Sequence, residues 1–469
     1  MIHRFLLDND GSNFFGQTMR DDVEASIEEA VWECPANVTT YLLCAGSARF
    51  YFPTRVGEVA PTYQRLLRAH AEGKDPFGLF LKALRKAGKE TFVTFRMNDV
   101  HNANEPDHPS VPSFRKKHPD LIVGAEAVRR GDHGWLNYCL DYSRPEVRQY
   151  LLALLREIIE GYDIDGLQLD WMRFPRHLSG TPEEVWEKRS ILTEFTAEVR
   201  AMMRRSGKRR LLGARVPSSL AGCRHVGLDV AEWARRGVID FLVAGPFLTT
   251  DFTMPLAEFR AAMGDRLVPL YASLDFGHGG QNHCPESLRG ACTSLYDCGA
   301  DGIYVFNFPC WTEYLAVRPY HWIGELHEPE LAARKPLLLG IAYNVHRMPD
   351  VDLPGLIPAK VTMGGTLEIP LHIPPAALPL KRVIALLQSG GDVALHVNGQ
   401  GAAELTELRR AELFPEFIDP AQTSQRPRWE DCRVFQPDAS ALKAGDNQLL
   451  IQNRSATELE IRRLNVGLW

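Results

Sequence analysis

Short runs of apolar and β-branched residues alternate with amphipathic stretches up to about residue 330 of the chain. Runs of this kind, bounded by turn residues, are typical of buried strands. We expect strands at His3–Asp8, Val38–Cys44, Thr91–Asn98, Ile164–Asp170, Leu211–Pro217, Phe241–Pro246, Val268–Asp275 and Gly302–Asn307. The stretches between them have helical spacing and predict helices at Asp21–Glu33, Phe77–Lys86, Pro145–Glu160, Pro182–Arg205, Asp229–Arg235 and Pro285–Tyr296.

Strand and helix alternate eight times, which predicts a (β/α)₈ TIM barrel over residues 1–334. Three of the expected helices begin at a proline followed by glutamate (Pro145, Pro182 and Pro285), a signal typical of helix N-termini. A doubly wound open sheet is the competing architecture, and it usually has a glycine-rich phosphate turn after its first strand. The first strand here runs into the sequence DNDGS (8–12), which is not a GxGxxG turn. The barrel is therefore the preferred prediction.

After about residue 334 the helical periodicity nearly vanishes and strand-like runs separated by turn signals take its place. We expect strands at Leu337–Tyr343, Gly365–His372, Arg382–Gln388, Val393–Val397, Gln448–Gln452 and Leu459–Val466. Residues 335–469 thus predict a β-sandwich domain. Its segments LHVNG (395–399) and AGDN (444–447) resemble sandwich modules attached to many glycosidases. The domain is either such a sugar-binding module or a packing domain without a ligand.

Composition narrows the class of protein further. The 469 residues include 53 Lys+Arg and 59 Asp+Glu, a balance that argues against a nucleic-acid partner. No apolar run approaches the roughly 18–20 residues that span a bilayer, so no membrane partner is expected. The nine cysteines contain no CxxC pair and indicate reduced thiols. The simplest compartment is the cytoplasm, or an extracytoplasmic one if a signal peptide has been removed. No cofactor is implied, and the oligomeric state stays open.

Polar residues occupy positions that should face the barrel axis. In the fourth strand Leu167 and Leu169 suit the helix layer, so Gly166, Gln168 and Asp170 should point inward. Asp170 then stands at the C-terminal end of its strand, where the active sites of such barrels form. The same alternation, continued into the loops, directs further polar side chains to this end: Asp8, Asp10, Thr94, Arg96, Asn98, Asp99, His101, Arg215, Tyr271, Ser273, Asp275 and Asn307. A merely structural barrel would place Val, Ile and Leu there, so a polar pocket is predicted, although Arg96 or Arg215 alone could equally be a salt-bridge member.

The segment 162–175, YDIDGLQLDWMRFP, resembles the hallmark YDVDGIxxDxxxYP of the bacterial glycosyl hydrolase-like proteins called family 10-like. The upstream motifs HPD (118–120), WLN (135–137) and RPEVRQY (144–150) agree with this likeness, which covers about residues 90–180 well and the remaining barrel loosely. The resemblance implies a barrel fold and a functional aspartate at Asp170. It implies little about the substrate.

Other glycosidases are similar to this strand in part. Family 18 chitinases have DGxDxDxE, whose terminal acid falls on Met172, so substrate-assisted chitinolysis is disfavoured. The α-amylase clan has DGxRxD with its last Asp as nucleophile, which is similar to Asp170 apart from Gln168 in place of Arg. The clan of cellulases and β-galactosidases uses Asn-Glu after strand four and Glu after strand seven. Both are missing here, and Asp275 occupies the strand-seven place.

Glycoside hydrolysis generally needs two carboxyl groups, a protonated acid and a base or nucleophile. We predict Asp170 as the ionised nucleophile or base, held by Arg173 or Arg96. The preferred partner is Asp275 and the runner-up is Asp251, with the pKa of the acid raised by apolar neighbours.

Substrate contacts are expected from aromatic, amide and basic residues on the same face. Trp135, Trp171 and Trp311 could stack on sugar rings or be a buried edge of the barrel, and the basic residues could bind the carboxylate or sulfate of an acidic sugar. The predicted carbohydrate-binding set is Asp8, Arg96, Asn98, His101, Asn137, Gln168, Trp171, Arg173, Arg215, Tyr271, Asn307 and Trp311.

Two alternatives remain open. A metal-dependent deacetylase or lyase could use histidines in loops of this face together with carboxylates, although HExxH and HxxxH spacings are absent. The candidate ligands are His101, His108, His133, His278, His283, Asp8, Asp10 and Asp99. The other alternative is a catalytically inactive carbohydrate-binding barrel, which needs similar residues.

Overall fold

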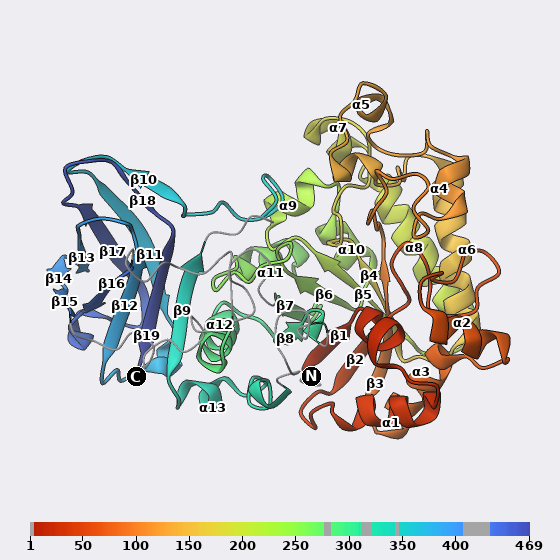
Figure 1. Ribbon diagram of the computed structural model, residues 1–469, viewed down its shortest axis with the longest axis horizontal. Coiled ribbons are helices and arrows are strands. Elements are labelled where there is room, and N and C mark those ends of the chain that lie inside the picture. The colour runs from red at the N-terminus through yellow and green to blue at the C-terminus, as the bar shows by residue number, and fades with distance from the viewer. Residues whose placement is uncertain (1–3, 276–282, 309, 311–319, 343–346, 407–431) are drawn as a thin grey trace.

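The computed structural model describes residues 4–275, 283–308, 310, 320–342, 347–406 and 432–469. Eight parallel strands form a closed barrel in the order of the sequence, and the eighth pairs back onto the first (Figure 1). The strands are β1 (Leu6–Asn9), β2 (Thr40–Cys44), β3 (Glu90–Arg96), β4 (Gly166–Asp170), β5 (Leu211–Val216), β6 (Phe241–Ala244), β7 (Leu270–Leu274) and β8 (Gly302–Val305). All eight fall within the predicted runs or overlap them, so the predicted TIM barrel is confirmed.

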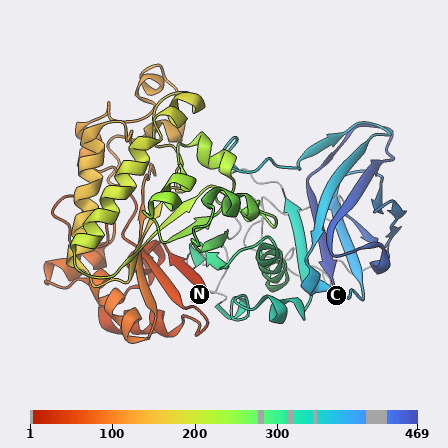
Figure 2. The same ribbon diagram turned by 180° about the vertical axis from the view of Figure 1, so that it is seen from behind.

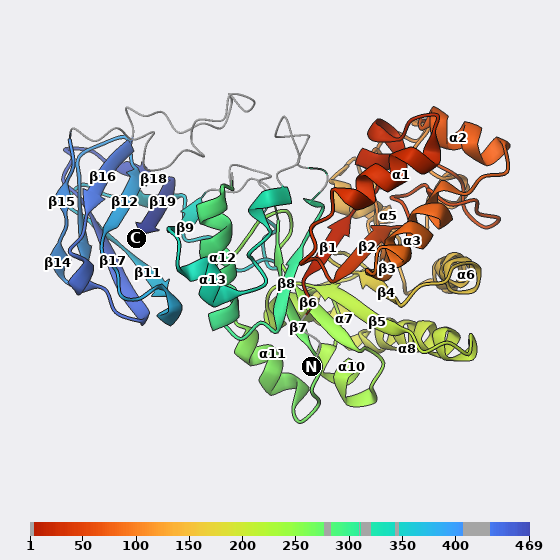
Figure 3. The same ribbon diagram turned by 90° about the horizontal axis from the view of Figure 1, so that it is seen from below.

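Helices surround this barrel, as Figure 3 shows. They are α1 (Val23–Trp32), α2 (Gln64–Ala71), α3 (Pro76–Lys86), α4 (Ser113–Lys117), α5 (Ala125–Arg129), α6 (Pro145–Gly161), α7 (Pro182–Glu187), α8 (Ser190–Arg205), α9 (Leu220–His225), α10 (Val230–Arg236), α11 (Leu256–Met263), α12 (Pro285–Asp297) and α13 (Pro329–Ala333). The helices α6, α7 and α12 each begin at the expected proline. The single helix expected over Pro182–Arg205 is two helices, the first of which starts with a capping box at Thr181.

Register decides which side chains share a layer inside the barrel, because paired residues of neighbouring parallel strands point to the same side. Asp170 pairs with Arg96 of β3 and with Arg215 of β5. These three side chains therefore share the layer nearest the C-terminal ends of their strands. One layer down, Gln168 pairs with Thr94.

Aromatic rings fill the opposite, N-terminal end of the barrel. The Phe241 ring lies 5.7 Å from that of Phe92 and 5.8 Å from that of Tyr271, centroid to centroid. Glycines leave the room for these rings: a Cβ atom at Gly213 would overlap the Phe241 ring. Large rings beside glycines close this end of the barrel.

The C-terminal region is built from antiparallel strands (Figure 2). Its strands are β9 (Leu337–Ala342), β10 (Ala359–Val361), β11 (Thr366–Ile373), β12 (Val383–Gln388), β13 (Val393–Val397), β14 (Gln400–Gly401), β15 (Ala403–Glu404), β16 (Cys432–Gln436), β17 (Gly445–Asn453), β18 (Leu459–Ile461) and β19 (Arg463–Leu468). Sheets of order β11-β17-β13-β14 and β15-β16-β12-β19-β9 enclose one apolar core that includes Ile369, Ile451 and Val383. This is the predicted β-sandwich.

Helix α12 lies between the barrel and the sandwich (Figure 1). Gly290 lets its backbone approach β9 so closely that an added Cβ would meet the Leu338 carbonyl. Arg289 of the same helix donates hydrogen bonds to the Pro336 carbonyl at 3.0 and 2.9 Å. No disulfide joins the nine cysteines, all of which lie in the described part of the chain. Among the described helices, none has the length and apolar character needed to cross a membrane.

Candidate active site

Asp170 and Arg215 form a buried ion pair at the C-terminal end of the barrel. Arg215 Nη1 lies 3.3 Å from each carboxylate oxygen of Asp170, and the two side chains are 1% and 2% exposed. The backbone N–H groups of Met172 and Arg173 donate to Asp170 Oδ1 at 3.0 and 3.1 Å. The sequence predicted that Arg173 or Arg96 holds Asp170. Arg173 does so through its backbone N–H, but the ion pair is formed with Arg215. Strand register places Arg215 beside Asp170, whereas Arg96 forms its ion pairs with Asp10 and Asp99.

Asp8 brings a second carboxyl group to the same cluster from the end of β1. Its side chain is buried, and Oδ1 accepts from the Asn307 backbone N–H at 3.4 Å. The Tyr304 hydroxyl lies beside this carboxyl group. Burial raises the pKa of the Asp8 carboxyl to about 7; the charge of Asp170 adds to the rise, and Arg215 and Arg96 oppose it. This carboxyl group therefore keeps its proton to a higher pH than an ordinary aspartate does.

Asp275 follows β7 and is also buried. Thr250 fixes its backbone: the Asp275 N–H donates to Thr250 Oγ1 at 2.9 Å, and that hydroxyl donates to the Asp275 carbonyl at 2.8 Å. Although burial opposes the rise, the neighbouring carboxyl groups of Asp170, Asp275 and Asp8 raise the pKa of Arg215. One guanidinium group thus lies in the field of three aspartates from three strands.

Asp251, the runner-up acid, is not brought into this cluster. Arg347 Nη2 donates to Asp251 Oδ1 at 2.7 Å. The Asp251 carboxylate therefore fixes the segment that contains Arg347, which follows the barrel strands in the sequence. Burial raises the pKa of Asp251, and the charge of Arg347 opposes the rise.

Arg96 is held by two carboxylates of its own. Its Nη1 lies 3.0 Å from Asp99 Oδ2 and its Nη2 lies 3.2 Å from Asp10 Oδ2. Asp99 Oδ1 in turn contacts His101 Nδ1 at 2.7 Å. Although burial alone would raise it, His101 and Arg96 bring the pKa of Asp99 well below its usual range. The positive charge of Arg96 is therefore already paired with carboxylates of the protein itself.

Gln168 forms the floor below these charges. Its Oε1 accepts hydrogen bonds from Thr94 Oγ1 and from the Tyr304 hydroxyl, each at 2.9 Å. Asn98 organises the loop after β3 instead, because its Nδ2 donates to the Arg176 carbonyl at 2.9 Å and its Oδ1 accepts from the Leu140 N–H at 2.8 Å.

Besides Asn98, three further residues of the predicted binding set are not brought to this cluster. Tyr271 lies at the other end of the barrel, where its hydroxyl accepts from Arg4 Nη1 at 3.4 Å. Trp171 is fully buried, with its ring 5.3 Å from that of Tyr142, so it belongs to the packed edge of the barrel. Asn137 holds its own loop: Nδ2 donates to the Asp132 carbonyl at 3.2 Å. Trp311 and His278 lie outside the described residues.

Sequence reasoning missed the aromatic residues of β8. Tyr304 reaches Gln168, and the Phe306 ring centroid lies 3.8 Å from Arg215 Cζ, close enough for a cation–π contact. Alternation along the strand could have found both, since residues 304 and 306 share one phase. Asn307, chosen from the sequence, follows the strand with a left-handed φ of 48° and contributes its backbone N–H to Asp8.

The rim of the mouth carries an aromatic group beside Arg173. Trp135 lies in a 3-10 helix (Trp135–Tyr138) and is 47% exposed. Its ring contacts those of Phe174 and Phe247 edge-on, at 5.4 and 6.1 Å between centroids. Arg173 Cζ lies over the same two rings, at 4.8 and 5.7 Å.

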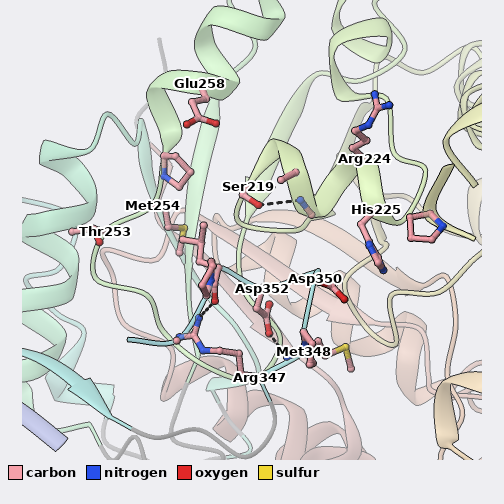
Figure 4. Close-up of a pocket in the computed structure, with 18 of the residues that line it drawn as sticks. Ser219, Arg224, His225, Thr253, Met254, Glu258, Arg347, Met348, Asp350 and Asp352 are labelled. Carbon is pink, nitrogen blue, oxygen red and sulfur yellow. Dashed lines mark hydrogen bonds between the residues drawn. The ribbon is translucent and has the colours of Figure 1, made fainter. Parts of the chain in front are cut away.

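A cavity of about 1140 Å³ opens beside the barrel mouth (Figure 4). Arg224 and His225 of α9 lie on one side of it, and Arg347, Met348 and Asp352 of the incoming segment lie on another. Met348 packs into the barrel core, so this segment is part of the barrel face. The residues that line this cavity do not include the carboxylates around Arg215.

The candidate metal ligands that the structure describes do not form a metal site. Within the described ranges, no group of three or more His, Cys, Asp or Glu side chains is arranged to hold a metal ion. His108 contacts Ser110 Oγ at 2.6 Å, and His133 contacts the Tyr138 hydroxyl at 2.8 Å. His283 lies against Ser287 Oγ at 3.0 Å, and burial lowers its pKa to about 4.

Solved structures similar to this chain are carbohydrate-active enzymes. An α-L-fucosidase isoenzyme 2 from Paenibacillus thiaminolyticus is 15% identical over 72% of this chain and 51% of its own, with a TM-score of 0.47. An Anoxybacillus α-amylase is 13% identical over 98% of both chains (TM-score 0.41), and a β-galactosidase from Marinomonas ef1 is 10% identical over 71% of this chain and 60% of its own (TM-score 0.44). The chain spans about half the length of the fucosidase.

No family model matches the chain, and no curated protein matches it either. At such low identity a structural likeness does not transfer an activity. A function for this protein therefore has to be inferred from its own side chains.

Proposed function

We propose that the protein is a glycoside hydrolase that acts on a poly- or oligosaccharide at the C-terminal mouth of its barrel. One observation carries the proposal: two neighbouring buried carboxyl groups differ in their surroundings. Asp170 accepts from the Arg215 guanidinium and two backbone N–H groups, whereas the pKa of Asp8 is raised to about 7. Carboxyl groups with such different environments are what acid and base roles require.

The chemistry assigns each group a step. Asp8 donates its proton to the glycosidic oxygen as the bond to the anomeric carbon breaks. Asp170 attacks the anomeric carbon, or removes a proton from the attacking water, and Arg215 keeps the carboxylate in place for either role. Asp275 is the second candidate for the acid. The distance between the two carboxyl groups across the substrate decides the outcome, about 5–5.5 Å for retention and about 6.5–9.5 Å for inversion.

The first experiment screens purified protein against neutral and acidic polysaccharides and aryl glycosides and measures new reducing ends. The variants Asp170→Asn, Asp8→Asn and Asp275→Asn then separate the roles. An aryl glycoside with a strongly activated leaving group needs no proton from the enzyme. Loss of the acid should therefore spare its cleavage, while loss of Asp170 should abolish cleavage of every substrate.

Asp352→Asn is the matched control, because Asp352 is buried and burial raises its pKa to about 7. Its carboxylate accepts from the backbone N–H groups of Phe247 and Met348. This variant should keep near-wild-type turnover. Near-wild-type turnover in Asp170→Asn would refute the proposal. If Asp8→Asn is unaffected and Asp275→Asn shows the selective loss, the acid is Asp275.

A binding barrel without catalysis is the second candidate. The observation that favours it is the burial of Asp8, Asp170 and Asp275, none more than 2% exposed. It predicts saturable binding of an oligosaccharide without new reducing ends, and aspartate variants that change affinity alone.

A further inference from the structure

Among the described residues, Arg173 differs from Arg96 and Arg215 because it forms no ion pair with a carboxylate. Arg96 and Arg215 each form ion pairs with aspartates. Within the described part of the chain, Arg173 forms none, although it is only 9% exposed. Its Nε and Nη1 atoms are buried and have no hydrogen-bond partner among the described residues. Burying a cation without a counter-charge is costly, so such a group calls for a functional explanation.

His101 holds this guanidinium in place. The His101 Nδ1 atom faces the Asp99 carboxylate at 2.7 Å, which assigns the ring proton to Nδ1. The Nε2 atom is then left to accept from Arg173 Nη2 at 3.0 Å. Burial and the charge of Arg96 lower the pKa of Arg173, and the charges of Asp99, Asp10 and Asp170 oppose this without cancelling it. The field at Arg173 would therefore favour an added anion.

The Arg173 guanidinium lies beside a group of aromatic rings that includes the exposed Trp135. Arg173 lies against the rings of Phe174 and Phe247, and the half-exposed indole of Trp135 contacts the same two rings. Phe174 adopts a left-handed φ of 55°, which is rare for a bulky side chain and is a strained conformation that the surroundings must hold. An exposed indole presents a flat apolar face of the kind that can cover a sugar ring.

We propose that Arg173 and Trp135 form a subsite for an anionic sugar, in which the carboxylate of a uronic acid or a sulfate ester accepts from the Arg173 Nε and Nη1 donors while Trp135 stacks on the ring. This inference rests on the proposed function, whose substrate class it narrows to acidic saccharides. Arg173 would be a specificity residue, since it recognises the charge and takes no part in bond cleavage.

Binding measurements test the subsite separately from catalysis. Calorimetric titration of the full chain uses oligomers of polygalacturonate, alginate and chondroitin sulfate as probes. Each is compared with a neutral counterpart, prepared by reducing its carboxyl groups and, for chondroitin sulfate, by also removing its sulfate; the two chondroitin changes are also made one at a time. At least one acidic oligomer should bind about tenfold or more tightly than its neutral counterpart. If the preference is lost when the carboxyl groups are reduced, the carboxylate is the recognised anion. If it is lost when the sulfate is removed, the sulfate is.

Three variants assign the effect to the subsite. Arg173→Gln should abolish the preference for the acidic oligomer, and Trp135→Ala should weaken binding of the acidic and neutral oligomers alike. Arg210→Gln is the control, because Arg210 is a buried arginine whose guanidinium donates to the Tyr162 carbonyl, remote from the mouth. It should leave the preference unchanged, and a melting curve for each variant confirms folding.

Two results would overturn the inference: no acidic oligomer is preferred over its neutral counterpart, or the preference persists in Arg173→Gln. Binding that prefers acidic oligomers without any cleavage would retain the subsite and refute the hydrolase. Cleavage of neutral glycans without a preference for charge would retain the hydrolase and refute the subsite.

Discussion

Arg215 Nη1 lies 3.3 Å from each carboxylate oxygen of Asp170, and both side chains are almost completely buried. The pair joins the ends of two adjacent strands, so it links the stability of the barrel to the geometry of its mouth. Buried pairs of this kind cost desolvation energy that only their mutual attraction and further hydrogen bonds recover.

The first prediction concerns this pair. Arg215→Met leaves Asp170 as a buried carboxylate without its counter-charge and should lower the free energy of unfolding by about 3–5 kcal/mol. Asp170→Asn in the same background should recover part of the loss, because the unpaired charge is gone. Urea unfolding of the two single variants and the double variant measures this coupling. Strictly additive effects would show that the two side chains do not interact in solution.

The second prediction concerns pH. Between the ordinary aspartate pKa of 3.8 and about 7, the folded protein keeps a proton on Asp8 that the unfolded chain has released. Folding therefore takes up a proton, and the free energy of unfolding should fall as pH rises through this window. Asp352 contributes with the same sign, since burial also raises its pKa to about 7. Unfolding measured at several pH values should show a shallower fall in Asp8→Asn and in Asp352→Asn.

Activity separates these two carboxyl groups. If Asp8 is the acid, kcat/KM of the wild type should decline above a pH of about 7, because the proton donor is lost. With a polysaccharide substrate, whose leaving group needs the proton, Asp352→Asn should retain this alkaline decline. With an activated aryl glycoside, which needs no proton from the enzyme, Asp8→Asn should be active and should lack the decline. An unchanged alkaline decline in Asp8→Asn would assign the titrating group to another residue.

The third prediction concerns the closed end of the barrel. Gly213→Ala places a methyl group against the Phe241 ring and should cost at least about 1–3 kcal/mol of stability through overpacking. Phe241→Leu should relieve part of this cost in the double variant. Gly161→Ala is the control, because a Cβ there meets nothing within 4 Å, and it should be nearly neutral. Equal thermal stability of Gly213→Ala and the wild type would contradict the packing described above.

Much of the fold could be predicted from the local sequence pattern. Alternation within β4 placed Gln168 and Asp170 on the inner face, because side-chain direction in a strand depends only on residue parity. Proline followed by glutamate marked the start of α6, α7 and α12 for an equally local reason. The short strands β10, β14 and β15 escaped prediction because runs of two or three residues carry no periodicity.

The sequence by itself determined the eight-fold alternation, the inward phase of Asp170 and the sandwich texture after residue 334, all of which depend on neighbours along the chain. Only the tertiary structure decided that Arg215 is the partner of Asp170 and that Tyr271 lies at the far end of the barrel. It also decided that Arg173 has no carboxylate partner among the residues that the structure describes. Pairing of charges depends on strand register and on distances across the barrel. The pKa of a carboxyl group such as Asp8 depends on burial and on charges brought by other strands, which no local pattern contains.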